Sequence, residues 1–244
     1  MNLDGAVSIV TGATGGIGGA IALALAERRG RIVITGRRAT RLGALNEAIV
    51  HRGGEATVVE GDITSVATAQ AVIDTTIKRY GRVDILVNSA GFGPPMPLID
   101  LSETVWDATV DSCLKGAYMM SRAVLPAMLA ADTGHIVQVS SIAGKGVEAN
   151  RTAYCAAQWG LQGFSLALQA ELAHTNVHIN VINPASVATD WWTTTDDPQP
   201  PSVLERMMTS DDVADAIVWM LTRPDRIFIG ELVIHNTLNP WASG

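Results

Sequence analysis

A glycine-rich turn near the start of the chain has the composition of a phosphate-binding loop. The stretch Thr11–Gly18 follows an apolar run at residues 6–10 and precedes an alanine-rich segment at residues 19–29. These flanks predict a buried strand before the turn and a helix after it. The glycines allow a tight turn, close approach of the backbone to a pyrophosphate and close packing of the helix on the strand. The N–H groups and partial positive charge at the helix N-terminus would hold the phosphates, so the turn predicts a dinucleotide site.

Two arginines indicate which dinucleotide is bound. The second expected strand, residues 31–35, is followed by Gly36, Arg37 and Arg38, and no acid lies nearby. An acid at this place selects NAD through the ribose hydroxyls, whereas basic residues accept a 2′-phosphate. The pair therefore predicts NADP(H) as the cofactor. The alternative is that the arginines are only a solvated basic start of the next helix.

The apolar pattern along the chain predicts the elements that position these residues. The expected strands lie at residues 6–10, 31–35, 56–60, 83–87, 135–139, 177–182 and 231–235, and they alternate with helical segments at 19–29, 42–49, 65–80, 102–130, 152–174 and 211–221. Continuously apolar strands that alternate with helices are typical of a parallel sheet covered on both faces. We therefore expect an α/β fold, a single doubly wound Rossmann-type domain over residues 1–244, with an irregular substrate loop at about residues 190–210. In such folds the ligand lies at the carboxyl ends of the strands.

Composition excludes several classes of function. A net charge of −7 over 244 residues argues against a nucleic-acid partner and against an anionic membrane surface. Two cysteines imply no disulfide framework, and we expect a cytoplasmic protein without a membrane span. His174 and His178 are four residues apart, but the second falls in an expected strand, so no metal site is predicted.

The spacing Gly-x-x-x-Gly-x-Gly, together with the segment Asn88–Gly91, resembles the short-chain dehydrogenase/reductase family, and the resemblance covers essentially the whole chain. In that family a serine three residues before a glycine lies thirteen residues before the catalytic tyrosine. Ser141 meets both counts, with Gly144 and Tyr154. The resemblance implies that Ser141 binds the substrate oxygen and that Tyr154 exchanges a proton with it.

The resemblance also implies the residues that hold the cofactor. Asp62 would contact the adenine, and Val187 and Thr189 would hold the nicotinamide carboxamide. Ala185 replaces a family glycine, so a left-handed backbone there would be strained. The full expected set is Gly12, Thr14, Gly15, Ile17, Gly18, Arg37, Arg38, Asp62, Ile63, Asn88, Ala90, Gly91, Tyr154, Gln158, Pro184, Val187 and Thr189.

Two departures from the family pattern fall in the catalytic machinery. The family motif is Tyr-x-x-x-Lys, but Gln158 occupies the place of the lysine, on the same helix face as Tyr154. The family lysine holds the nicotinamide ribose and lowers the tyrosine pKa, whereas a glutamine amide donates hydrogen bonds without charge. Cys113 stands where the family often has an asparagine that helps to hold a water in a proton relay. Gln158 and Cys113 thus change both ends of one relay.

Three functions remain open at this point. The chain is an NADP(H)-dependent oxidoreductase that transfers hydride between nicotinamide and a carbonyl or alcohol, or it catalyses a redox-neutral step such as a cyclisation, elimination or isomerisation, or it binds NADP(H) without catalysis. A replacement cation is one way to keep the redox reaction, and Lys145, just after Ser141, is a candidate for it.

Aromatic residues on both sides of the expected site indicate an apolar small-molecule substrate. Trp191 and Trp192 follow the nicotinamide segment, and Phe92 and Met96 lie in the opposite loop. These side chains are expected to cover the substrate, although tryptophans also suit a subunit interface. The resemblance implies a homodimer or homotetramer.

Overall fold

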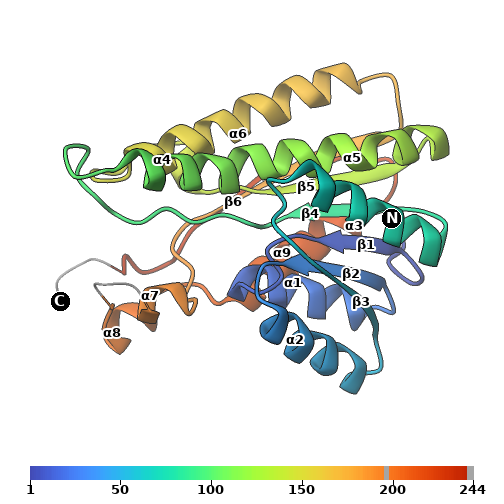
Figure 1. The fold of residues 1–244 in the computed structure, drawn as a ribbon, viewed down its shortest axis with the longest axis horizontal. Helices are drawn as coiled ribbons and strands as arrows, with labels where there is room; N and C mark the ends of the chain where they lie inside the picture. Colours follow the sequence, from blue (N-terminus) through green and yellow to red (C-terminus); the bar gives the residue numbers. More distant parts are fainter. Residues whose placement is uncertain (195–197, 241–244) are drawn as a thin grey trace.

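The computed structural model describes residues 1–194 and 198–240, which form a parallel sheet of seven strands in the order β3-β2-β1-β4-β5-β6-β7 (Figure 1). Every predicted strand is present. The strands are β1 Val7–Val10, β2 Arg31–Gly36, β3 Glu55–Glu60, β4 Ile85–Asn88, β5 Gly134–Val139, β6 Val177–Pro184 and β7 Glu231–Ile234. The order reverses between β1 and β4, and ligands bind at such a switch point in open α/β sheets.

Helices cover both faces of the sheet, as predicted. Figure 1 shows α5 and α6 on one side of the strands and α1, α2 and α9 on the other. Successive strand residues point to opposite faces, so Val10 belongs to one hydrophobic core and Ile9 to the other. The bounds of the helices are α1 Gly16–Ala26, α2 Ala39–His51, α3 Val66–Tyr80, α5 Gly116–Ala131, α6 Thr152–Glu171 and α9 Ser210–Leu221.

The helix expected at residues 102–130 is interrupted, which corrects the prediction. Ser102, at the predicted start, caps it, since its Oγ accepts a hydrogen bond of 3.3 Å from the N–H of Val105. However, the first helix, α4, covers only Glu103–Val110, a π-helical turn spans Asp111–Lys115, and α5 follows. A π turn holds one more residue than an α-helical turn. Here the wider turn contains Cys113, which is buried against the loop that follows β4.

The expected irregular segment contains two short helices, α7 Trp191–Thr194 and α8 Pro201–Leu204. Residues 195–197 of the expected substrate loop lie outside the described residues. An isolated parallel β-bridge between Val187 and Met208 brings the two ends of this segment together. In Figure 1 both helices lie to one side of the strands, below the end that α4 occupies.

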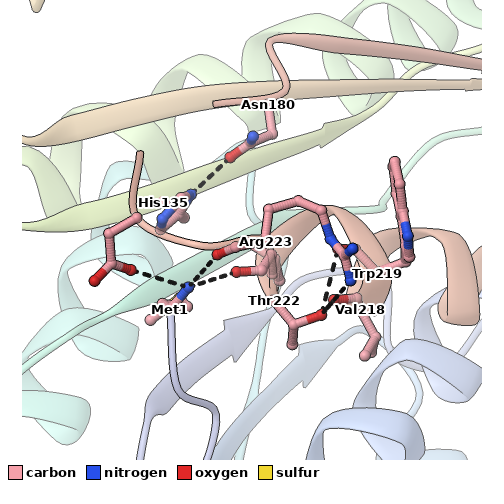
Figure 2. A network of polar contacts seen from close by, with 9 residues as sticks. Met1, His135, Asn180, Val218, Trp219, Thr222 and Arg223 are labelled. Carbon is pink, nitrogen blue, oxygen red and sulfur yellow. Dashed lines mark hydrogen bonds and ion pairs between the residues drawn. The ribbon is translucent and has the colours of Figure 1, made fainter. Parts of the chain in front are cut away.

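A network of polar contacts lies at the amino ends of β5 and β6 (Figure 2). The Met1 ammonium donates to the carbonyl oxygen of Leu221 over 2.8 Å, and His135 and Asn180 share a hydrogen bond of 2.9 Å. His178 lies beside His135, with ring centroids 5.3 Å apart, and burial lowers the pKa of both imidazoles. Within residues 1–194 and 198–240, no three His, Cys, Asp or Glu side chains lie close enough together to hold a metal ion. No helix in these residues is long and apolar enough to span a bilayer.

The turn before α1 provides a test of the packing. Gly18 lies in regular helix, but a Cβ there would overlap the carbonyl oxygen of Gly12. We expect Gly18→Ala to lower the free energy of unfolding by about 1–3 kcal/mol, as overpacking does, measured by urea denaturation. The matched control is Gly43→Ala in α2, where a Cβ meets nothing within 4 Å. That change should stabilise by about 1 kcal/mol, because alanine is the better helix former. Equal effects at both glycines would contradict the packing argument.

Candidate active site

The glycine turn lies directly against the end of β4. Gly12 adopts a left-handed backbone with a φ of +63°, and a Cβ on it would lie 2.6 Å from Cα of Ala90. The N–H of Ser89 donates to Oγ1 of Thr11 over 3.1 Å, which ties the ends of β1 and β4 together. Only glycine fits at residue 12, so the turn is pressed into the crevice where the strand order reverses.

Helix α1 begins with amide groups that no side chain caps. Its N-cap is Gly15, and Gly15 and Gly16 are both exposed. A Cβ on Gly16 would lie 3.0 Å from Cγ2 of Thr189, so the segment after β6 reaches the same turn. The fold therefore brings predicted cofactor residues from the two halves of the chain together. First-turn N–H groups without a cap are suited to phosphate oxygens.

Basic residues gather beside the glycine turn. Nη2 of Arg38 donates to the Thr14 carbonyl oxygen over 2.6 Å, and Arg41 pairs with Asp190 over 3.1 Å. Partial burial lowers the pKa of Arg38, and the charges of Arg41 and Arg37 lower it further. Mutual repulsion of this kind is relieved by an anion, so the end of β2 is suited to a phosphate group.

Asp62, after β3, is oriented by its own loop. Its Oδ1 accepts hydrogen bonds from the N–H and the hydroxyl of Thr64, over 3.0 and 2.8 Å. The backbone bond is the main reason that the pKa of Asp62 is lowered. The neighbouring Ile63 is buried against Gly116 rather than open at the surface.

Ser141 and Tyr154 form the centre of the site. The Ser141 side chain lies beside Tyr154, and its Oγ accepts a hydrogen bond from the N–H of Ala143 over 3.1 Å. Burial raises the pKa of Tyr154 to about 12, and the neighbouring Cys113 adds to the rise. The neighbouring Ser141 hydroxyl and the charge of Arg151 oppose the rise. Tyr154 is therefore a neutral phenol at physiological pH, able to donate a proton.

Gln158 is turned into the protein behind Tyr154. It is 4 % exposed, and its Oε1 accepts a hydrogen bond of 2.8 Å from the hydroxyl of Ser140. Its side chain also lies beside Cys113. Because Ser140 occupies the carbonyl oxygen, the NH2 group of Gln158 is the end available to other acceptors. The two departures from the family pattern, Gln158 and Cys113, therefore touch each other.

A chain of polar side chains extends from Gln158 to the surface. Gln162 donates to Ser140 over 3.0 Å and also to Asn183. Asn183 in turn donates to Glu231 over 2.8 Å, and Glu231 pairs with Lys145 over 2.5 Å. The charge of Lys145 is thus engaged at the start of β7, which weakens its case as a replacement cation.

Arg151, which the sequence analysis missed, is the cation beside Tyr154. Its Cζ lies 5.1 Å from the ring centroid of Tyr154 and 5.5 Å from that of Trp191. Nη1 donates to the carbonyl oxygen of Gly93, and Nε donates to Glu148 over 3.2 Å. The spacing of three residues between Arg151 and Tyr154, one helical turn, was the signal in the sequence.

The expected substrate residues lie on α7 and in the loop after β4, the two segments that contact Arg151. Trp191 and Trp192 meet edge to face, with centroids 4.6 Å apart, and Nε1 of Trp192 donates to the Val187 carbonyl oxygen over 2.9 Å. In the opposite loop, the Phe92 carbonyl oxygen accepts from Cys113 over 3.4 Å, and the N–H of Met96 donates to Asn150 over 2.6 Å.

Other residues of the predicted cofactor set lie in the interior or against it. Asn88 is buried, and its amide donates to Gln138 over 3.0 Å and to Ser121 over 3.2 Å, so it links β4 to β5 and to α5. Ala185 does not have a left-handed backbone, because its φ is not positive, so the condition for strain at this residue is not met. Pro184 ends β6 and is buried, while Gly91 lies close to Sγ of Cys113.

The buried thiol of Cys113 makes stability depend on pH. Burial raises its pKa to about 11, whereas a thiol in an unfolded chain titrates near ~8.5. Between these two values the unfolded chain loses the thiol proton while the folded chain keeps it. The contribution of the thiol to the free energy of unfolding is therefore complete below about pH 8.5 and is lost as the pH rises to about 11. The loss is about 1.4 kcal/mol per pH unit at most. We expect Cys113→Ala to lose less stability than the unmodified chain between pH 7 and roughly pH 10.5 in urea unfolding. The difference between the two free energies of unfolding at pH 7 reports packing alone. An identical loss of stability between pH 7 and roughly pH 10.5 in both proteins would contradict this account.

Comparison with known proteins agrees with this geometry. Residues 6–200 match the family described as short chain dehydrogenase. An uncharacterized oxidoreductase of Listeria innocua is 31% identical over 248 residues, which cover 99% of this chain and 100% of that protein. D-threitol dehydrogenase of Mycolicibacterium smegmatis is 39% identical over 191 residues, 77% of this chain and 72% of the relative. A solved metagenomic short-chain oxidoreductase in complex with NADP is 36% identical, with a TM-score of 0.83 over 98% of this chain and 100% of that one. The chain belongs to the short-chain dehydrogenase/reductase family.

Proposed function

We propose that this oxidoreductase uses NADP(H) to interconvert a carbonyl compound and an alcohol, mainly as a carbonyl reductase. One observation carries the proposal: Ser141 and Tyr154 lie side by side in a chain whose glycine turn occupies the switch point of the sheet. A proton donor and a dinucleotide cradle are the two parts that hydride transfer to a carbonyl requires.

The residues present fit the cofactor. Gly12 and Gly18 allow the turn to pack closely on β4 and on itself, and the exposed Gly15 and Gly16 leave the start of α1 open to a pyrophosphate. Uncapped amides of α1 would bind its oxygens, and Arg37 and Arg38 would bind the 2′-phosphate. Asp62 would hold the adenine side, and Val187 and Thr189 the carboxamide. NADPH, when bound, supplies the hydride.

Ser141 and Tyr154 would act on the substrate oxygen. Ser141 donates a hydrogen bond that orients the carbonyl, and Tyr154 gives its proton to the oxygen as the alcohol forms. With a pKa of about 12, Tyr154 stays protonated below that pH and is ready to act as the acid in reduction. Oxidation needs the phenolate as base, so its rate should rise with pH. The NH2 group of Gln158 would donate to a nicotinamide ribose hydroxyl, in place of the family lysine.

A redox-neutral reaction is the second candidate, and the raised pKa of Tyr154 favours it. A neutral phenol beside an uncharged Gln158 can protonate or orient a substrate without net hydride transfer. Carbonyl-dependent loss of NADPH absorbance separates the two functions, because a redox-neutral step consumes no cofactor. For either function we propose a homodimer or homotetramer through α5 and α6, where Trp159 and Leu166 are exposed.

Cofactor choice can be tested at the two arginines. We expect Arg37→Ala to weaken NADPH binding about 10–100-fold, since a charged hydrogen bond is worth about 1.5–3 kcal/mol, and to leave NADH binding almost unchanged. Arg38→Ala should weaken both cofactors, because Arg38 also holds the carbonyl oxygen of Thr14. Fluorescence titration measures the dissociation constants. Arg52→Ala is the control, as Arg52 is exposed and pairs with Glu27 far from the turn. Equal NADPH and NADH losses in Arg37→Ala would refute the 2′-phosphate assignment.

The missing lysine can be restored. We expect Gln158→Lys to lower the pKa of Tyr154 by about 1–3 units, because a cation within reach favours the phenolate. Alcohol oxidation near neutral pH should then rise about 10-fold or more, and its pH profile should shift to lower pH. Gln158→Met, of similar length and without charge, separates the charge from the shape. Tyr154→Phe should abolish turnover in every background. An unshifted pH profile in Gln158→Lys would show that Tyr154 is not the acid/base.

A further inference from the structure

We propose that Arg151 binds a carboxylate of the substrate, so that the carbonyl compound reduced at Tyr154 is an oxo acid. The inference rests on the proposed function and deepens it, because it names the substrate class. It also modifies the expectation of a wholly apolar substrate, since a cation lies in the middle of the aromatic lining.

The position of Arg151 is suited to a substrate contact. Its guanidinium lies close to two rings, that of Tyr154, the proposed proton donor, and that of Trp191 on α7. The side chain is only 15 % exposed, so its charge is poorly solvated compared with a surface arginine. A group bound here would lie next to the carbonyl that Tyr154 and Ser141 address.

The backbone fixes this position. Asn150 has a left-handed φ of +61°, and its carbonyl oxygen accepts the N–H of Met96 over 2.6 Å. Gly93 packs directly under Tyr154, since a Cβ on it would lie 2.5 Å from Cδ2 of that ring. The loop after β4 and the start of α6 therefore hold Arg151 from both sides.

Part of the hydrogen-bonding capacity of Arg151 is unused. A guanidinium has five N–H groups, and here Nε donates to Glu148 while Nη1 donates to Gly93. Nη2 makes no hydrogen bond with residues 1–194 and 198–240. A simple clamp between the loop and the helix would need only the first two contacts. An arginine with an open edge beside a reacting centre is suited to a carboxylate.

Charge decides between possible anions. Two other basic residues at this edge are engaged in ion pairs, Arg41 with Asp190 and Lys145 with Glu231. Arg151 is also partly neutralised by Glu148, whose side chain is 43 % exposed. One cation with one acidic neighbour favours a monoanion such as a carboxylate over a phosphate dianion, which is usually bound by several donors. The carboxylate is not altered in the reaction, so the bond changes remain those of the proposed reduction.

Matched acids and esters test the inference. We expect pyruvate, acetoacetate or levulinate to be reduced with a kcat/KM at least 10-fold above that of its methyl ester, chiefly through KM. Arg151→Gln should lower this acid-to-ester ratio about 10–100-fold, and Arg151→Lys should restore part of it. Glu148→Gln should raise the ratio, because it removes the competing carboxylate. Arg223→Gln is the control, since Arg223 also lies over a tryptophan, Trp219, but outside the site. An unchanged ratio in Arg151→Gln, or a preference for esters in the unmodified protein, would overturn the inference.

A binding measurement keeps the two proposals separate. The oxo acid that binds most tightly should quench Trp191 fluorescence in the NADP⁺-loaded protein, less in Arg151→Gln and not at all in Trp191→Phe. If NADPH binds and neither acids nor esters are reduced, the proposed reductase function fails. Quenching by the acid that depends on Arg151 would still support the carboxylate site. Reduction of carbonyl compounds without Arg151-dependent quenching or selectivity would leave the reductase intact and disprove the carboxylate site.

Discussion

The close approach of two backbones at the centre of the sheet determines where everything else lies. At Gly12 the chain leaves β1, and it passes Ala90 so closely that a single methyl group would not fit. This contact lies where the strand order reverses, so the segments after β1 and β4 diverge from one point. The divergence opens the crevice in which a dinucleotide lies in such folds. Three residues beyond Ala90, Gly93 lies in the same loop, and the ring of Tyr154 packs against it.

Charge is distributed unevenly around Ser141 and Tyr154. Behind Tyr154, at the position of the lysine in the family motif, the Gln158 side chain lies against the neutral groups of Ser140 and Cys113. Amides and hydroxyls fix orientation, but they do not store a proton at neutral pH. The polar chain that starts at Gln158 reaches formal charges at its far end, where Lys145 pairs with Glu231, whereas Arg151 lies apart from this chain, beside the ring of Tyr154. Uncharged hydrogen-bonding groups thus lie on one side of the tyrosine and a cation lies on another.

Local patterns carried most of what could be predicted. The strands and the glycine turn follow from composition over a few residues, and the Ser141–Tyr154 pair from a fixed spacing. The π turn could not be predicted, because one extra residue in a helix leaves no mark in composition. The partner of Gln158 depends on how α6 packs against the end of β5, which brings Ser140 to it from 18 residues away. The direction of Arg151 depends on the left-handed backbone of Asn150, a tertiary choice that propensity does not determine.

The π turn at Asp111–Lys115 makes chain length, rather than residue type, the critical variable in this part of the chain. A π turn absorbs one residue more than an α-helical turn, so removal of one residue would convert it to regular helix, with α4 and α5 still in phase, and would shift the side chains of the turn itself. Cys113 would then leave the loop that carries Gly91 and Phe92. Alignments of related chains should therefore place insertions and deletions outside this segment, even where its side chains differ freely.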